Sequence, residues 1–339
     1  MTKRERFMNF LANKPVDRAP VALFHHFIDI PMWFKGLENE EAFELNIVGH
    51  KKSRDVFDPD VIKVMNDSLM MINIDMSFVE KASDLRNIKP PMPGSPFFEK
   101  SKELTKRSLA YYADSDAPKY VTGFSPMMVL RNNLVGLDLG VAQTKKPLIV
   151  EFMEEDPESV LAGMRLITDC ILALNEMLIK ECGADAVYFS VNNQQEYIPE
   201  DLYRKYVMPF ELEILAAANA MSDLNALHVC GYKGKGNNLE LYKDYEAAWI
   251  NWAVHAEGVG LAEGKKLFKG KPVCGGFEQA TDIYTGTREE VEAHVFQILD
   301  DAGSVGVMIG ADCTVPTDID DNRLEWVRQA SIKYAEAHK

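Results

Sequence analysis

Short apolar or β-branched runs recur along the chain, and each is followed by a longer amphipathic or irregular segment. The runs are bounded by Gly, Pro, Asn or Asp, which is typical of strands buried on both faces of a parallel sheet. This pattern predicts strands at Val21–Phe24, Tyr120–Phe124, Ala186–Val191, Ala226–Val229, Trp249–Val254, Pro272–Gly275 and Val305–Ile309. A further, less regular strand is expected near Ile72–Phe78.

Helical patterns lie between several of these strands. They predict helices at Asp156–Cys182, Pro199–Met221 and Thr287–Ala302. The first of these has an acidic, Pro-bearing first turn, and Gly183 supplies a left-handed stop after it. The last begins with a capping box, in which Glu290 stands three residues after Thr287.

Repeated alternation of strand and helix favours a barrel over other α/β folds. We therefore expect one α/β domain over residues 1–339, a single (β/α)8 TIM barrel with an N-terminal helical elaboration. The first seventy residues and Asp84–Ser108 are expected to form helical or irregular elaborations around the barrel mouth. An open doubly wound sheet is the alternative, but no Gly-x-Gly-x-x-Gly turn follows any predicted strand.

Charge and composition exclude several classes of function. The formal net charge is −15, and no stretch gathers Lys and Arg into a basic stripe, so nucleic-acid and membrane partners are not expected. No apolar run is long enough to span a bilayer, and the N-terminus has no secretion-signal pattern. Five cysteines without regular spacing do not predict a disulfide framework. We therefore expect a cytoplasmic protein whose reduced thiols are free to bind metal.

The stretch from Asn225 to Tyr232 holds the strongest candidate site. His228 and Cys230 are two residues apart, so on a strand their side chains leave the same face, at the carboxyl end where barrel enzymes place their chemistry. Cys313 follows the last predicted strand and can join them, because the loops after barrel strands converge on one mouth. Imidazole and thiolate are preferred zinc ligands, and three protein ligands with one open position are typical of catalytic zinc.

The other cysteines have a simpler interpretation. Cys170 and Cys182 lie on predicted helical faces, and Cys274 lies inside an apolar run. A buried free cysteine is a common core residue, so these three are expected to serve packing.

A family resemblance is carried by segments from both ends and the middle of the chain. They are Thr2-Lys-Arg-Glu-Arg-Phe7, Pro15-Val-Asp-Arg-Ala-Pro20, Gly183-Ala-Asp-Ala-Val-Tyr-Phe-Ser190 and Leu202-Tyr-Arg-Lys-Tyr-Val-Met-Pro-Phe210. With these segments the chain resembles the uroporphyrinogen decarboxylase superfamily over nearly its full length. The superfamily holds cofactor-free porphyrinogen decarboxylases, and also methyltransferases that move methyl groups from methylated corrinoid proteins to thiols, as in methylcobamide:coenzyme M methyltransferases.

Two segments separate these branches. The decarboxylases resemble one another in an arginine-rich segment after the first strand, where this chain reads Phe24-His-His-Phe-Ile-Asp-Ile-Pro31 without any arginine. They also share a Gly-His-Gly after the final strand, where this chain has Asp312-Cys313-Thr314. His-x-Cys followed by a distant Cys resembles the zinc pattern of the methyltransferase branch. The resemblance thus implies a zinc enzyme, with a methylcobalamin-type corrinoid supplied by a partner protein.

Further candidate residues follow from their places at strand ends or from the resemblance. Glu278 is the first candidate for a fourth zinc ligand, ahead of Glu257 and Glu263, and a catalytic role is assigned to His255. Asp67 falls where the decarboxylases resemble each other in a catalytic aspartate. Substrate-binding candidates are His26, Phe124, Tyr188, Asn192, Asn193 and Gln194. Packing, turn formation or solvation is the alternative role for each of them.

The leading hypothesis is a zinc-dependent methyltransferase that moves a methyl group between a corrinoid protein and a small thiol or methylated substrate. A demethylating component that loads methyl from a methoxylated aromatic, methylated amine or thioether onto a corrinoid protein needs the same site. A non-catalytic metal- or corrinoid-binding protein and a decarboxylase of a small acid are the remaining alternatives.

Overall fold

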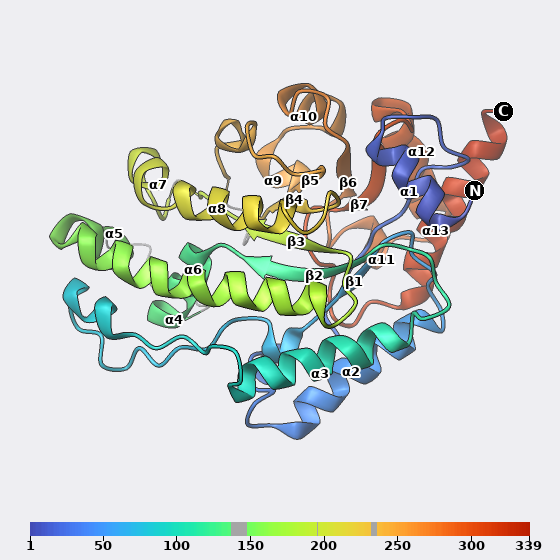
Figure 1. Ribbon diagram of the computed structural model, residues 1–339. Coiled ribbons are helices and arrows are strands. Elements are labelled where there is room, and N and C mark those ends of the chain that lie inside the picture. Colours follow the sequence, from blue (N-terminus) through green and yellow to red (C-terminus); the bar gives the residue numbers. More distant parts are fainter. Residues whose placement is uncertain (137–147, 195, 232–235) are drawn as a thin grey trace.

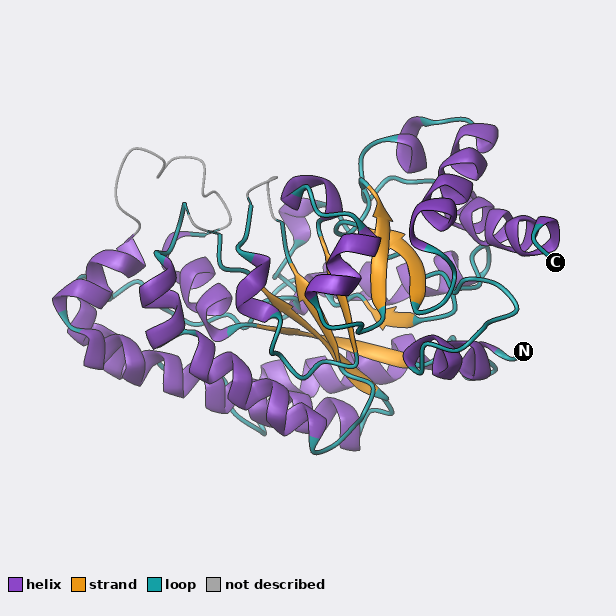
Figure 2. Cartoon of the chain, turned by 90° about the horizontal axis from the view of Figure 1, so that it is seen from above, coloured by secondary structure: helices purple, strands orange, loops and turns teal. Residues whose placement is uncertain are grey.

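The computed structural model describes residues 1–136, 148–194, 196–231 and 236–339. Within these residues the centre is a parallel sheet whose strands lie side by side in chain order. The strands are β1 (Ile62–Val64), β2 (Lys119–Phe124), β3 (Ala186–Val191), β4 (Ala226–Val229), β5 (Trp249–Trp252), β6 (Val273–Phe277) and β7 (Val307–Ala311). The sheet curls, with helices on its outer side and both chain termini at one end of the molecule (Figures 1 and 2).

The sheet confirms most of the predicted strands and corrects two of them. Val21–Phe24 forms no continuous strand. Val21 makes only an isolated parallel bridge with Ile309, although its carbonyl also accepts the N–H of Asp60 at 3.0 Å. This segment thus lies between β7 and β1 without adding an eighth strand to the described sheet.

The predicted strand at Ile72–Phe78 is also wrong. Its alternating apolar and polar residues suggest a strand, but the side chain of Asn133 takes its backbone hydrogen bonds. The Asn133 oxygen accepts from the N–H of Ile74 at 2.8 Å, and its amide donates to the carbonyl of Ile72 at 2.9 Å. The first strand is instead β1, which the sequence analysis missed because Lys63 interrupts a very short apolar run.

The helices and short helical turns form the outer layer around the sheet. The α-helices are α1 (Lys3–Leu11), α2 (Glu40–Arg54), α3 (Pro96–Ala110), α4 (Pro126–Val135), α5 (Leu148–Glu155), α6 (Pro157–Lys180), α7 (Glu200–Tyr206), α8 (Met208–Asn219), α9 (Val254–Glu257), α10 (Leu261–Leu267), α11 (Asp282–Thr285), α12 (Arg288–Ala302) and α13 (Asp321–Ala337). The 3-10 turns are η1 (Ile30–Met32), η2 (Asp67–Leu69), η3 (Ala82–Asn87) and η5 (Leu239–Tyr242). Among the described residues, no helix has the length and apolar character that a membrane crossing requires.

Local sequence signals explain where several helices begin and end. The side chain of Asp156 caps α6, and Gly183, shortly after its end, has a left-handed φ of +85°, as predicted. The capping box of Thr287 and Glu290 starts α12. The predicted helix Pro199–Met221 is split into α7 and α8 around Val207, because Pro209 lacks the N–H that a continuous helix needs.

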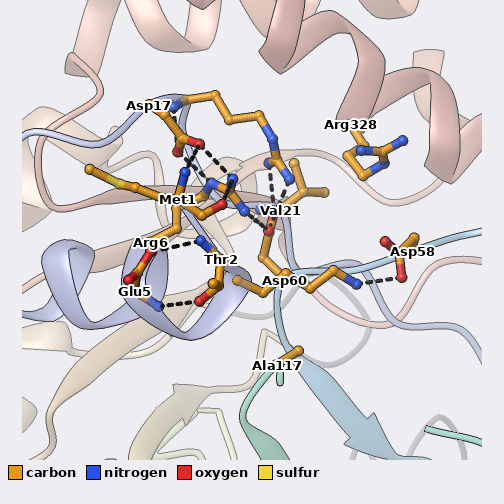
Figure 3. A network of polar contacts seen from close by, with 12 residues as sticks. Met1, Thr2, Glu5, Arg6, Asp17, Val21, Asp58, Asp60, Ala117 and Arg328 are labelled. Atoms are coloured by element: carbon orange, nitrogen blue, oxygen red, sulfur yellow. Dashed lines mark hydrogen bonds and ion pairs between the residues drawn. The ribbon is translucent and has the colours of Figure 1, made fainter. Parts of the chain in front are cut away.

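Large aromatic side chains close the interior of the curled sheet at the amino ends of its strands. Phe7 and Phe10 of α1 pack against Tyr120 and Trp249, and the Trp249 indole donates to the Tyr120 hydroxyl at 2.9 Å. A buried ion network also joins Asp60 to Arg6 and Arg18, and Figure 3 shows Asp60 with Arg6 and Asp17. Because these side chains fill this end among the described residues, the carboxyl ends of the strands are the side from which a ligand would enter the interior.

Candidate metal centre

Three predicted ligands meet at the carboxyl edge of the sheet. His228 is in β4, Cys230 directly follows that strand, and Cys313 lies two residues beyond β7. Their ligand atoms all lie within 4.8 Å of one another, and the sulfur of Cys313 is 4.0 Å from Nε2 of His228. The structure therefore brings together the residues that the strand pattern predicted.

Backbone contacts fix the two cysteines in place. The N–H of Cys230 donates to the carbonyl of Val191 at 2.8 Å, which continues the pairing of β4 with β3. Gly231 then turns the chain where a side chain has no room, since a Cβ there would lie 2.4 Å from the Cβ of Ala253. The N–H of Asp312 donates to the carbonyl of Phe277 at 2.8 Å, so Cys313 stands just past the last pair of β6 and β7.

Asn251 of β5 determines which ring nitrogen of His228 is available. The Asn251 amide donates to the carbonyls of Cys274 and Ala311, so its oxygen must face the opposite way. That oxygen lies 2.5 Å from Nδ1 of His228 and also accepts from the Tyr188 hydroxyl at 2.7 Å. Nδ1 therefore carries the proton, and the lone pair of Nε2 points toward the cysteines.

Replacing Asn251 with alanine is expected to weaken zinc binding by roughly 10- to 100-fold, because the imidazole loses the contact that sets its tautomer and orientation. Competition with a chelator of known affinity measures this change. Asn225→Ala is the matched control, since Asn225 is also buried at a strand edge but bonds Val187 and the turn before β4. Equal zinc affinity in the two variants would contradict the assigned role of Asn251.

Electrostatics distinguish Cys313 from the packing cysteines. The hydrogen bond with Cys230 holds the pKa of the Cys313 thiol well below its ordinary value, and contact with His228 lowers it further against the effect of burial. Burial alone raises the pKa of Cys274 and raises that of Cys170 to about 12. Cys313 is thus better prepared to act as a thiolate ligand than Cys170 and Cys274.

A cavity of about 800 Å³ opens above these ligands, and apolar side chains form most of its wall. We call it the mouth cavity. His228, Cys230 and Cys313 line it together with residues of the first loop, of the loop after β1 and of α4. Of the predicted substrate-binding residues, those that line it are His26, Phe124, Tyr188 and Asn192.

Asp67 contacts two neighbouring residues of the first loop, His26 and Phe27. Its buried carboxylate lies 2.8 Å from Nδ1 of His26 and accepts the N–H of Phe27 at 2.6 Å. His26 faces the cavity, whereas the neighbouring His25 turns away and lies 2.9 Å from a carboxylate oxygen of Asp321. Asp67 therefore holds a residue of the cavity wall and does not itself line the cavity.

Other predicted site residues lie outside this group. The carboxylate of Glu278 folds back to accept the N–H of Ala280, so it does not join the three ligands. His255 lies 3.0 Å from the carboxylate of Asp312. Asn193 and Gln194 do not line the mouth cavity, and the Asn193 side chain instead bonds the backbone of Asn238. Of the alternative carboxylates, Glu257 bonds Asn237 and Glu263 is exposed on α10.

Sequence reasoning missed three residues of the site: Asn251, Lys63 and Arg131. Asn251 is the one polar residue in the apolar Trp-Ile-Asn-Trp of β5, and Lys63 is the one charge in β1. A polar residue inside a buried strand was the available signal in both cases. Arg131 lies on α4, lines the mouth cavity and donates to Asn192 at 3.4 Å, and no sequence signal marks it.

The donor set fits zinc. Nε2 of His228 is free to bind a metal because Nδ1 of the same ring contacts Asn251, and the sulfurs of Cys230 and Cys313 lie nearby. These are soft and borderline ligands, and a metal held by three of them would keep one further position for a ligand.

The fold and the site together define the class of protein: an α/β protein with a parallel sheet and with one histidine and two cysteines gathered at the carboxyl edge of that sheet. Residues 125–334, well over half of the chain, match the model of the family described as uroporphyrinogen decarboxylase (URO-D), and the chain belongs to this family. The resemblance found in the sequence is thereby confirmed at the level of the family.

Two solved structures share the fold. A methyltransferase from Methanosarcina mazei aligns with a TM-score of 0.68 and 14% identity, over 98% of this chain and 99% of its own. A B12-independent methionine synthase from Shewanella sp. W3-18-1, in complex with selenomethionine, aligns with a TM-score of 0.56 and 14% identity, over 95% of this chain and 98% of its own. A search of curated protein sequences gave no significant match.

Proposed function

We propose that this protein is a zinc-dependent methyltransferase that moves a methyl group between a corrinoid carried by a partner protein and a small thiol or methylated substrate. The observation that carries the proposal is the meeting of His228, Cys230 and Cys313 on the floor of the mouth cavity. The family membership and the fold shared with a methyltransferase support it.

In this proposal the residues of the site have separate roles. His228, oriented by Asn251, and the two cysteines would hold the metal. Zinc bound there supplies Lewis acidity, which lowers the pKa of a coordinated thiol or polarises a methylated heteroatom. The mouth cavity holds the substrate against this centre and admits the methyl donor or acceptor from one side only, so that catalysis is chiefly positioning.

The charge of the cavity argues against a decarboxylase that takes a polycarboxylate. Among the described residues, the lysines and arginines that line it are Lys63 and Arg131. The segment from Phe24 to Pro31 adds no arginine. Two cations cannot pair many carboxylates in a protein whose net charge is −15.

The same proposal includes the finer features of the fold and setting. The segment Val21–Phe24 would take the place of the eighth strand in a (β/α)8 barrel that spans residues 1–339 as one domain. A reducing cytoplasmic location would keep the two cysteines as ligands.

Two measurements on the wild-type protein test the proposal. After purification under reducing conditions without added metal, elemental analysis is expected to find about one zinc per chain. The zinc-loaded protein is then expected to exchange methyl groups with free cobalamin. The visible absorption of the cobalamin measures this exchange. No zinc even after reconstitution would overturn the proposal, whereas zinc without any methyl exchange would favour a non-catalytic metal-binding protein.

A further inference from the structure

Lys63 carries a positive charge into the interior of the sheet beside the metal centre. Its ammonium lies 4.6 Å from the ring centre of Tyr188 and 4.8 Å from that of Phe24. The Tyr188 ring is stacked on His228 at a centroid distance of 5.2 Å. Lys63 also lines a small inner cavity below the mouth cavity, of about 10 Å³, together with His228 and Cys313. The ammonium and the ligands therefore face the same space.

The surroundings of Lys63 combine aromatic rings with the cysteines of the candidate metal centre. Among the residues that the structure describes, Lys63 makes no ion pair, and its contacts are the two aromatic rings. The nearby carboxylate of Asp67 is taken by His26 and the backbone of Phe27. Burial lowers the pKa of Lys63, whereas the charges of Cys313, Asp67 and Cys230 act in the opposite direction. If a metal took up the two cysteines, a ligand that brought negative charge into this space would gain from the ammonium of Lys63.

The position of this charge bears on the direction of methyl transfer. Zinc held by two thiolates would be neutral, so a heteroatom that has lost its methyl group would add one negative charge to the centre. A nearby ammonium stabilises that charge, and by withdrawing electron density it makes the same atom a weaker nucleophile. Lys63 thus favours the direction in which the heteroatom gives up its methyl group over the direction in which the heteroatom attacks one.

On the basis of the proposed function, we propose that Lys63 is the catalytic group that stabilises the heteroatom as it loses a methyl group, and that the protein demethylates a methyl ether or methyl thioether with an apolar body. In this step the bond between the heteroatom and the methyl carbon breaks, and its electron pair stays on the heteroatom. A Co(I) corrinoid supplies the electron pair of the new cobalt–carbon bond and becomes methyl-Co(III). The heteroatom leaves as an anion and takes a proton from water afterwards.

The size and lining of the mouth cavity fit this substrate class. Its volume of about 800 Å³ lies in the range of sites for drug-sized ligands and exceeds what a small thiol fills. Trp33, Met65, Phe124 and Met128 contribute to a mostly apolar wall. An aromatic or other apolar body in this space would bring its methylated atom to the floor, where Lys63 and the metal ligands lie.

The binding test compares a demethylated probe, thiophenol, with its methylated counterpart, thioanisole, on zinc-loaded protein of verified metal content. Quenching of tryptophan fluorescence reports binding, since Trp33 lines the cavity. Lys63→Met is expected to bind thiophenol roughly tenfold more weakly, or worse, while its affinity for thioanisole stays the same. Lys63→Arg keeps the charge and is expected to retain most of the preference. Lys205→Met is the matched control, because Lys205 also lies over a tyrosine ring, but on exposed α7.

The kinetic test measures both directions with free cobalamin. For Lys63→Met, kcat of demethylation, with thioanisole and cob(I)alamin, is expected to fall at least about tenfold. The kcat of the reverse reaction, with thiophenol and methylcobalamin, is expected to stay equal or rise, because the bound thiolate is no longer stabilised. Unchanged thiophenol affinity, or an equal fall of both kcat values, overturns the inference about Lys63. Absence of zinc or of methyl exchange in the wild type would instead refute the proposed function itself.

Discussion

Replacing Cys313 with alanine is expected to remove zinc from the protein as purified. The change deletes one of two thiolates and leaves His228 and Cys230 as a two-ligand site. Structural zinc sites bind with about 10–16 kcal/mol over four ligands, so one thiolate accounts for roughly 3 kcal/mol, or more than a hundredfold in affinity. Elemental analysis after dialysis against a weak chelator measures the loss, and circular dichroism checks that the variant is folded.

Cys274→Ala provides the matched control for this experiment. Cys274 is a buried cysteine of β6 that lines the inner cavity, but its sulfur is not part of the ligand group. The variant loses one sulfur atom from the core and is expected to keep its full zinc content. If Cys313→Ala retained zinc as well as Cys274→Ala does, the three-ligand centre would be refuted.

The sequence predicts the fold best where a buried strand is long and uniform. Ala186–Val191 and Ala226–Val229 match β3 and β4 to the residue, because unbroken apolar runs between turn residues have few alternative structures. The prediction fails where contacts far along the chain decide the outcome. Asn133 draws Ile72–Phe78 out of the sheet, and no local pattern reveals that contact.

The candidate ligands of the site could be predicted from the sequence, whereas the residues that orient them could not. His228, Cys230 and Cys313 stand at or just after strand ends, and the curl of the sheet expected for a barrel brings the ends of β4 and β7 together. Asn251 and Lys63 act through the interior of the sheet, and their partners depend on the register between strands. Glu278 shows the converse case, since a carboxylate after a strand end can as easily cap its own turn.

The site also depends on the opposite end of the sheet. Asp60 precedes β1, the strand that carries Lys63, and the N–H of Asp60 donates to the carbonyl of Val21. In return its carboxylate accepts the N–H of Val21 at 2.8 Å. Asp60 therefore links Val21, which precedes the cavity-lining residue His26 in the chain, to the start of β1.

Replacing Asp60 with alanine is expected to destabilise the protein by about 3–5 kcal/mol. The Asp60 side chain is fully buried and lies between the guanidinium groups of Arg6 and Arg18, which are each 7% exposed (Figure 3). Without this carboxylate, Arg18 loses the ion pair that it makes among the described residues, and Arg6 keeps its pair with Asp17. The midpoint of urea unfolding, followed by circular dichroism, measures the change.

The matched control for Asp60 is Asp58→Ala. Asp58 lies two residues away and pairs with Lys3 and Arg54, but its side chain is 42% exposed. Water compensates an exposed pair, so this variant is expected to lose less than about 1 kcal/mol. A similar loss in both variants would mean that the buried network acts as an ordinary surface ion pair. A loss confined to Asp60→Ala would show that the closed amino end, which leaves the cavity open on one side only, depends on a single carboxylate.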